Sequence, residues 1–257
     1  MDSSFQRKIV LITGASSGLG AAIARKFAEH GTLLSLTGRN EVNLENVAKD
    51  CKDKGAREVL TILADFVNLE DIKKVAEKTI VKYGKLDVLI NNAGVARFGV
   101  LESVKFTDFD WMFQINIKSV VYLSQLLIPH LVKSKGNIVN LSSVASTIQY
   151  PQALIYGMTK SSLDQFTKTI ALEYAPKGVR VNAVNPSGIR TSLLRHEFEN
   201  NQDADSAWDN FAQFHPMGRL GTVEDVVSAV MFLASDASSW TTGQCLVLDG
   251  ARSLNAN

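Results

Sequence analysis

A tyrosine and a lysine stand four residues apart in the second half of the chain, at Tyr156 and Lys160. Side chains at this spacing share one face of a helix, so a cation is expected to lie beside a phenol. A nearby positive charge favours the phenolate, and the pattern therefore predicts that Lys160 lowers the Tyr156 pKa from its usual value of about 10. A phenol tuned in this way gives or takes a proton near neutral pH, which is general acid–base chemistry. Ser143 lies thirteen residues before the tyrosine.

A glycine-rich segment near the amino end, TGASSGLG from Thr13 to Gly20, follows the apolar run Lys8–Ile12. Glycine lets the backbone turn sharply and approach a ligand closely. A helix that starts here presents free N–H groups and a positive dipole to a pyrophosphate. The spacing is Gly-x3-Gly-x-Gly and not the commoner Gly-x-Gly-x-x-Gly. The segment predicts a dinucleotide site, and a strand–helix turn without a ligand is the alternative.

The end of the second expected strand bears on which dinucleotide binds. An NAD site usually places an acid there, whereas an NADP site offers an arginine to the 2′-phosphate. Here Arg39 follows Gly38 with no acid before it, and Ser16 belongs to the loop nearby. Arginine binds phosphate with two hydrogen bonds. We therefore expect NADP(H) in preference to NAD(H), with a solvated surface arginine as the alternative.

Size and composition exclude several classes of protein. The chain has 257 residues, 46% of them hydrophobic, and a formal net charge of +1, which does not favour a nucleic-acid binder. Cys51 and Cys245 indicate reduced thiols of an intracellular protein. The apolar runs fall short of the ~20 residues of a membrane span, and the polar amino end is no signal peptide. We expect a cytoplasmic protein without a metal site, because the four histidines lack ligand spacing.

Short apolar runs alternate with longer amphipathic ones, which predicts a single doubly wound parallel α/β sheet with helices on both faces. Seven strands are expected, at 8–13, 33–37, 59–64, 86–90, 137–141, 179–184 and 245–248. Six helices are expected, at 18–30, 41–54, 68–83, 107–133, 151–175 and 222–235. One domain covers 1–257, since no linker appears. The segment 192–215 breaks the rhythm, and we expect a substrate lid around 190–216.

Together these motifs resemble the short-chain dehydrogenase/reductase family, whose order and spacing they follow over most of the chain. The residues that carry the resemblance are Thr13 to Gly20, Asn91-Asn92-Ala93-Gly94, Asn116, Ser143, Tyr156, Lys160 and the turn beginning Asn185-Pro186. The resemblance implies a Rossmann-type sheet of about seven strands and hydride transfer between a nicotinamide and a carbonyl carbon. It also implies a homotetramer or homodimer.

The resemblance assigns roles residue by residue. Ser143 would bind the substrate oxygen, Tyr156 would donate the proton, Lys160 would tune the tyrosine and bind the nicotinamide ribose, and Asn116 would hold a relay water. The cofactor would be bound by Gly14, Ser16, Ser17, Gly18, Leu19, Gly20, Arg39, Asp65, Asn91, Ala93, Gly94, Pro186, Ile189 and Thr191. Each residue also has an ordinary structural interpretation, such as a turn cap for Ser143 or a packed aromatic for Tyr156.

Two positions depart from the family pattern. The family usually has Pro-Gly after the sixth strand, and this chain has Pro186-Ser187-Gly188. Near the end, Asp249-Gly250-Ala251 stands where Asp-Gly-Gly is usual. A side chain in place of glycine is expected to change the local backbone geometry near the nicotinamide.

The expected substrate pocket is apolar and aromatic. It would be lined by Phe98, Val144, Ile148, Tyr150, Leu193 and Leu194, with Phe198, Trp208 and Phe211 from the lid. Such a lining suits a lipophilic carbonyl compound such as a steroid ketone, although the same residues can simply pack the lid onto the sheet. Reduction of a 3-oxoacyl thioester on an acyl carrier is the alternative activity. The acid-rich segment 193–215 weighs against that acidic partner. A non-catalytic NADP(H) sensor on the same fold is the alternative of another class.

Overall fold

The computed structural model describes residues 5–190 and 208–254. Seven parallel strands form one sheet: β1 (Ile9–Thr13), β2 (Leu33–Gly38), β3 (Glu58–Leu63), β4 (Val88–Asn91), β5 (Asn137–Leu141), β6 (Arg180–Pro186) and β7 (Cys245–Leu248). The main helices are α1 (Gly18–Ala28), α2 (Glu41–Asp53), α3 (Leu69–Tyr83), α4 (Phe106–Phe113), α5 (Ser119–Ser134), α6 (Leu154–Tyr174) and α8 (Val223–Ala234). The predicted fold class is confirmed.

The strand order is β3-β2-β1-β4-β5-β6-β7. The chain therefore winds outward from β1 to β3 and then crosses back to build the other half of the sheet from β4. The reversal falls between β1 and β4, whose residues Val10 and Val88 are paired. In such sheets ligands bind beyond the carboxyl ends of the strands at this switch point.

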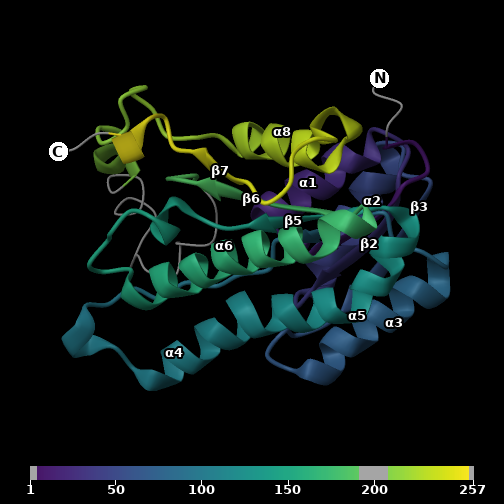
Figure 1. The fold of residues 1–257 in the computed structure, drawn as a ribbon, viewed down its shortest axis with the longest axis horizontal. Coiled ribbons are helices and arrows are strands. Elements are labelled where there is room, and N and C mark those ends of the chain that lie inside the picture. Colours follow the sequence, from purple (N-terminus) through teal and green to yellow (C-terminus); the bar gives the residue numbers. More distant parts are fainter. Residues whose placement is uncertain (1–4, 191–207, 255–257) are drawn as a thin grey trace.

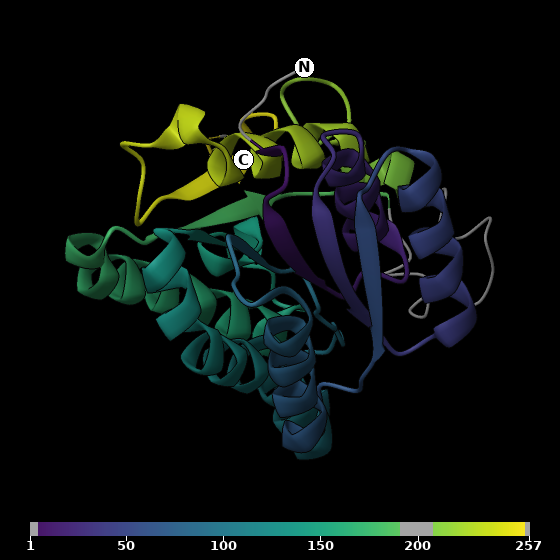
Figure 2. The ribbon, with the colours of Figure 1, turned by 90° about the vertical axis from the view of Figure 1, so that its right-hand side faces the viewer.

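Helices cover both faces of the sheet, as Figures 1 and 2 show. The alternation of side chains along β1 explains why both faces need cover: Val10 and Ile12 belong to one buried cluster, and Ile9 and Leu11 to the other. The first cluster packs under α1, α2 and α8 and the second under α3, α5 and α6. Each fully buried aliphatic or Phe side chain contributes about 1.5–3 kcal/mol relative to an exposed one.

The predicted helix at 107–133 is continuous but not uniform. Residues Gln114–Lys118 between α4 and α5 form a π-helical turn, which sequence periodicity did not predict. Single π turns often occur at functional sites, and this one contains Asn116. By length and composition alone Phe106–Ser134 is apolar enough to cross a membrane, a test that the core helix of a globular domain also passes. Three of its leucines are fully buried under the sheet, as in a core helix: Leu123, Leu127 and Leu131.

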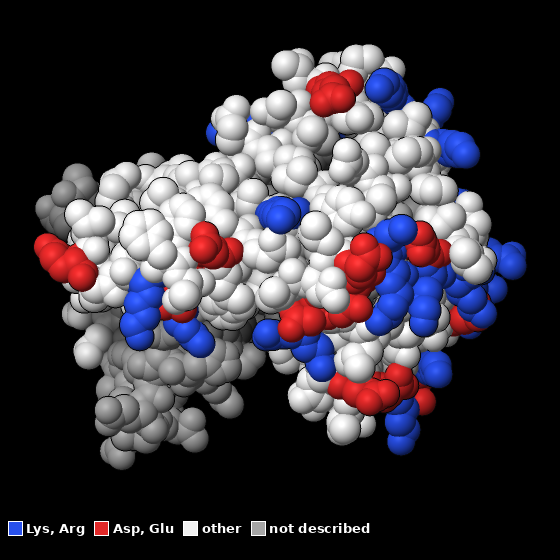
Figure 3. Space-filling view, turned by 90° about the horizontal axis from the view of Figure 1, so that it is seen from below, with Lys and Arg blue, Asp and Glu red and all other residues white. Residues whose placement is uncertain are grey.

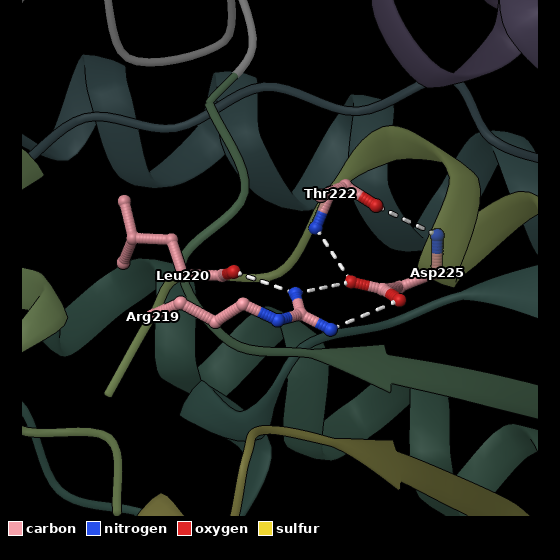
Figure 4. A network of polar contacts seen from close by, with 4 residues as sticks. All are labelled: Arg219, Leu220, Thr222 and Asp225. Atoms are coloured by element: carbon pink, nitrogen blue, oxygen red, sulfur yellow. Dashed lines mark hydrogen bonds and ion pairs between the residues drawn. The ribbon is translucent and has the colours of Figure 1, made fainter. Parts of the chain in front are cut away.

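The start of α8 is fixed by a network of polar contacts (Figure 4). Thr222 and Asp225 form a reciprocal capping box. The Arg219 guanidinium donates to both Asp225 oxygens, at 2.7 and 3.3 Å, and to the Leu220 carbonyl. Arg219 holds the pKa of the Asp225 carboxyl down at about 2. Gly221, which immediately precedes this capping box, forms a β-bridge with Ile189 just after β6. The network therefore holds the start of α8 next to the end of β6.

Ala251, the second departure from the family pattern, has a φ of 68°. This left-handed conformation costs a residue with a Cβ about 1–2 kcal/mol. The strain explains why glycine is usual at this position.

We predict that Ala251→Gly raises the free energy of unfolding by about 1 kcal/mol, because the released strain exceeds the added entropy of the unfolded chain. Denaturant unfolding of both proteins measures the difference. The matched control is Ala237→Gly in the 3-10 turn Asp236–Ser238, where φ is not positive and the same change should destabilise. An unchanged or lower stability for Ala251→Gly would contradict the account.

Candidate active site

The loop between β1 and α1 is shaped by its glycines. Gly14 has a φ of +64°, and a Cβ on Gly20 would lie 2.3 Å from the Gly14 carbonyl oxygen. No side chain can therefore be added at Gly20 without moving the backbone of the loop. The loop is drawn tightly over the start of α1, as a phosphate cradle requires.

The amino end of α1 keeps its backbone donors available. Ser17 is the N-cap but makes no side-chain cap hydrogen bond, and the first turn holds no acid. By contrast, the N-cap side chains of α2 and α3, Asn40 and Asn68, accept such bonds. Free N–H groups and an uncompensated positive dipole favour an anion at this helix end.

Asn92 ties this loop to the end of β4. Its amide donates to the carbonyl oxygens of Thr13 at 2.8 Å and Gly14 at 3.2 Å. The Thr13 hydroxyl in turn accepts from the backbone N–H groups of Asn92 and Ala93. Asn92 is a positioning residue that the site prediction missed, although it stands within the recognised Asn-Asn-Ala-Gly segment.

A pocket of about 220 Å³ lies beyond the carboxyl ends of the strands. Ten of the predicted cofactor-binding residues line it: Gly14, Ser16, Ser17, Gly18, Leu19, Arg39, Asp65, Ala93, Gly94 and Pro186. Tyr156 and Lys160 line the same pocket, so the structure brings the two predicted sites together. Several lining residues were missed because only the fold places them there: Thr37, Ala64, Phe66, Val95, Ile115, Leu141 and Ser142.

Three predicted cofactor residues do not line this pocket. Gly20 packs behind the loop, and Asn91 is 3% exposed and donates to Asn140 inside the sheet at 2.9 Å. Ile189 is buried beside Gly221. Thr191 lies outside the described residues.

Arg39 and Asp65 are exposed at one end of the pocket. Within the described part of the chain, the Arg39 guanidinium forms no hydrogen bond or ion pair. The side chain of Ser16 is close by, because a Cβ on Gly38 would lie 2.8 Å from its hydroxyl oxygen. This end of the pocket therefore presents an available cation and a hydroxyl.

At the other end, Tyr156 and Lys160 lie one turn apart on α6. The Lys160 ammonium is 5.5 Å from the centre of the Tyr156 ring. Lys160 is only 6% exposed, and its Nζ donates to the Leu141 carbonyl at 2.8 Å. The predicted proximity of phenol and cation is confirmed.

The predicted direction of the tyrosine shift is wrong. Burial raises the pKa of Tyr156 to about 12, and the hydrogen bond with the neighbouring Ser143 hydroxyl acts in the opposite direction without outweighing it. Burial also lowers the pKa of Lys160 to about 8. Desolvation disfavours the charged form of each group and outweighs the attraction expected from spacing alone. The phenol is therefore held protonated, which is the form that can donate a proton.

Ser143 and Asn116 occupy defined places around this pair. Ser143 caps the short turn Val144–Ser146, accepting from the Ala145 N–H at 3.2 Å, so its structural interpretation is also correct. Asn116 in the π turn is 1% exposed; its amide exchanges two hydrogen bonds with Val95 and donates to Thr159 at 3.0 Å. A Cβ on Gly94 would lie 3.5 Å from the Asn116 oxygen and 3.7 Å from the Lys160 Nζ, so the three meet at one point.

None of the described substrate residues lines the pocket, and of these residues Phe98 is the one in ring contact with Tyr156. Phe98 is 40% exposed, with its ring 6.4 Å from that of Tyr156. Val144 is buried, Ile148 is half-buried and Tyr150 packs 6.4 Å from Phe211. Leu193 and Leu194, with most of the predicted lid, lie outside the described residues.

The Ser187 departure is accommodated away from the pocket. Its hydroxyl lies 2.9 Å from Nε2 of His215, which is 2% exposed, and its N–H donates to the Leu248 carbonyl. Pro186 still lines the pocket, whereas Ser187 does not. The added side chain therefore has a buried polar partner, which the sequence did not indicate.

Three kinds of group thus converge: a phosphate-type loop, an exposed arginine, and a half-buried tyrosine beside a buried lysine with a serine nearby. This combination defines an oxidoreductase of the Rossmann type that uses a nicotinamide dinucleotide. In agreement, the family described as enoyl-(acyl carrier protein) reductase matches residues 14–251. The chain belongs to the short-chain dehydrogenase/reductase family.

Known relatives span almost the whole chain. The 3-oxoacyl-(acyl-carrier-protein) reductase FabG of Thermotoga maritima is 36% identical over 244 residues, covering 95% of this chain and 96% of that protein. The 2-(R)-hydroxypropyl-CoM dehydrogenase of Xanthobacter autotrophicus is 33% identical, covering 95% and 98%. The crystal structure of levodione reductase superimposes with a TM-score of 0.92 at 28% identity, covering 97% and 99%. The chain is accordingly an oxidoreductase of the CH–OH/C=O class that uses NAD(P)(H).

The tight loop yields a prediction. Gly20→Ala should weaken NADPH binding by about tenfold or more, roughly 1.4 kcal/mol, because the new Cβ displaces the Gly14 carbonyl. Titration of NADPH fluorescence measures the affinity. Gly84→Ala is the matched control, since Gly84 lies outside the pocket lining and its added Cβ meets nothing within 4 Å, so NADPH affinity should not change. Wild-type affinity in Gly20→Ala would refute the role of the loop.

Proposed function

We propose that the protein is an NADPH-dependent reductase of a lipophilic ketone, with a steroid-like ketone favoured as substrate. The observation that carries the proposal is the convergence of Arg39, the half-buried Tyr156 and the buried Lys160 on one pocket. The residues at both ends of the pocket fit a dinucleotide with an extra phosphate.

The cofactor preference rests on charge at the open end of the pocket. A guanidinium without a partner in the described residues offers two parallel hydrogen bonds to a 2′-phosphate. The Ser16 hydroxyl beside Gly38 adds a further donor. Strand β2, which leads to Arg39, has the sequence LLSLTG from Leu33 to Gly38. It contains no acidic residue that would repel a phosphate.

The protein's own groups supply the proton chemistry. Bound NADPH would supply a hydride to the carbonyl carbon. Ser143 and Tyr156 would hold the carbonyl oxygen and polarise it. Tyr156, kept protonated by burial, would donate its phenolic proton as negative charge develops on that oxygen. The neighbouring Lys160 ammonium would stabilise the resulting phenolate.

The substrate class rests on the surroundings of Tyr156. The ring of Phe98, 6.4 Å from that of Tyr156, offers an aromatic surface that suits a bulky lipophilic carbonyl. We propose that Val144 and Tyr150 extend this surface toward the lid. Reduction of a 3-oxoacyl thioester is the second candidate, and the similarity to FabG favours it. A non-catalytic NADP(H) sensor is a weaker candidate, because such a protein has no need of a complete Tyr–Lys–Ser set.

We also propose that the chain acts as one domain with a lid around 190–216 and assembles as a homotetramer or homodimer. The face in Figure 3 supports assembly: charged side chains are dense on the right, over α3, and sparser on the left, over α4. Large apolar side chains exposed around this region include Leu101 at 75% and Phe106 at 77%. A cytoplasmic location remains a prediction of the sequence.

Tyr156→Phe should lower kcat by at least about 10²-fold, because the variant has no proton to donate. Its affinity for NADPH should stay at the wild-type level, which separates chemistry from binding. Steady-state turnover and cofactor titration measure the two quantities. Tyr174→Phe at the far end of α6 is the matched control and should retain activity. Turnover near the wild-type rate in Tyr156→Phe would disprove the proton-donor role.

Arg39→Ala should weaken NADPH binding by about tenfold or more, since charge-assisted hydrogen bonds contribute about 1.5–3 kcal/mol. The affinity for NADH, which lacks the 2′-phosphate, should not change. Parallel titrations with the two cofactors measure both values. Arg57→Ala, an exposed arginine outside the pocket lining, serves as the control. An equal loss for both cofactors, or no loss, would rule out 2′-phosphate recognition by Arg39.

A further inference from the structure

A carboxylate is buried beneath the active site, on the same helix as Tyr156 and Lys160. Asp164 lies one turn beyond Lys160 on α6 and is only 5% exposed. No Lys or Arg in the described part of the chain forms an ion pair with it. Burying a carboxylate without a paired cation lowers the stability of the fold. Its charge and its hydrogen bond are therefore the two features that bear on a role in the site.

The hydrogen bond connects Asp164 to the end of β6. The Asn185 amide donates to Asp164 Oδ2 at 2.7 Å. The same amide nitrogen lies 3.3 Å from the carbonyl oxygen of Ser143 and 3.0 Å from the hydroxyl of Ser146. Asp164 thus orients the Asn185 side-chain amide, and this amide in turn holds the turn after β5 that contains Ser143.

This connection also reaches the pocket wall. Asn185 directly precedes Pro186, which lines the pocket, and the Ser143 hydroxyl donates to the Pro186 carbonyl at 3.5 Å. The Asp164–Asn185 pair therefore joins three segments: α6 with the Tyr–Lys pair, the turn with Ser143, and the end of β6.

The charge of Asp164 acts on Lys160. Burial lowers the pKa of Lys160 to about 8, and the Asp164 carboxylate raises it in opposition. The other polar groups around the ammonium are the Leu141 carbonyl, the Asn116 amide and the Tyr156 phenol, none of which is charged at neutral pH. The Cys245 thiol on β7 is a hydrogen-bonding neighbour of Asp164, and Lys168 lies one turn further along α6; burial first and then the Asp164 charge raise the pKa of Cys245 to about 11.

We propose that Asp164 is a positioning residue for the reduction: its hydrogen bond to Asn185 places Ser143, and its negative charge keeps Lys160 in the cationic form. The inference rests on the proposed function, since it assigns a part in that same site. It also makes a separate claim about the charge of Lys160 that can be tested without turnover.

Two nearly isosteric variants separate the two parts of the proposal. Asp164→Asn keeps an oxygen that accepts from Asn185 but removes the charge. Asn185→Leu keeps the charge but removes the amide that holds Ser143. Thr167→Val, one turn further on α6, is the structural control, because it loses a buried hydrogen bond from Asn140 at 2.9 Å but carries no charge and lies two turns from Lys160.

The measurements are kcat/KM for a carbonyl substrate and the dissociation constant of NADPH, each between pH 6 and 9, with thermal unfolding as a check on folding. In Asp164→Asn the charged form of Lys160 is less favoured, so its pKa falls. Activity and NADPH affinity should then decline from a lower pH than in the wild type, with near wild-type values retained at pH 6. Asn185→Leu should lower kcat by about tenfold at every pH without moving the midpoint. Thr167→Val should reduce stability and leave both pH profiles in place.

Superimposable pH profiles for Asp164→Asn and the wild type would overturn the charge role, as would an equal shift in Thr167→Val. A wild-type kcat in Asn185→Leu would overturn the positioning role, and this variant still decides that part if Asp164→Asn does not fold. If NADPH binds but no carbonyl compound is reduced, the proposed function fails, and the NADPH affinity profile alone still decides the charge role of Asp164.

Discussion

A lysine ammonium lies out of water beneath the pocket, and much of the active-site geometry follows from how the chain accommodates it. Burial disfavours its charge and lowers its pKa from the usual value to about 8. The Leu141 carbonyl at the end of β5 accepts one of its hydrogens, and Asp164 supplies opposite charge from the next turn of α6. The same desolvation keeps Tyr156 protonated. One low-dielectric environment therefore holds both a proton donor and a cation in the states that carbonyl reduction needs.

At the nucleotide end of the pocket the polar groups are exposed and not buried, so their hydrogen-bond donors are available to a ligand. The N-cap of α1 makes no side-chain bond, and Arg39 is exposed. Asn92 fixes the loop by bonding to Thr13 and Gly14, so the open donors sit on a rigid support. The sheet joins the two ends, because β1, β4 and β5 are neighbours and their carboxyl ends carry the loop, Asn92 and Leu141.

The sequence predicted the elements well, because strong periodicity and glycine spacing are local signals. Each of the seven strands appears within two residues of its expected bounds at either end, and the Tyr–Lys pair meets the phosphate-type loop as expected. The π turn at Gln114–Lys118 was missed because its residues have ordinary helical propensities. The sign of the Tyr156 shift was wrong because spacing reports proximity but not desolvation. The contact of Ser187 with His215 was also hidden, since it joins residues 28 positions apart.

The central claim is that this pocket uses NADPH to reduce a carbonyl compound. The most direct measurement is the loss of reduced-nicotinamide absorbance with NADPH and, in parallel, NADH, across ketosteroids, quinones and 3-oxoacyl thioesters. The account predicts turnover of a lipophilic ketone with NADPH preferred. Tight NADPH binding without turnover of any compound would contradict it and favour a sensor, and turnover confined to acyl thioesters would contradict the proposed substrate class.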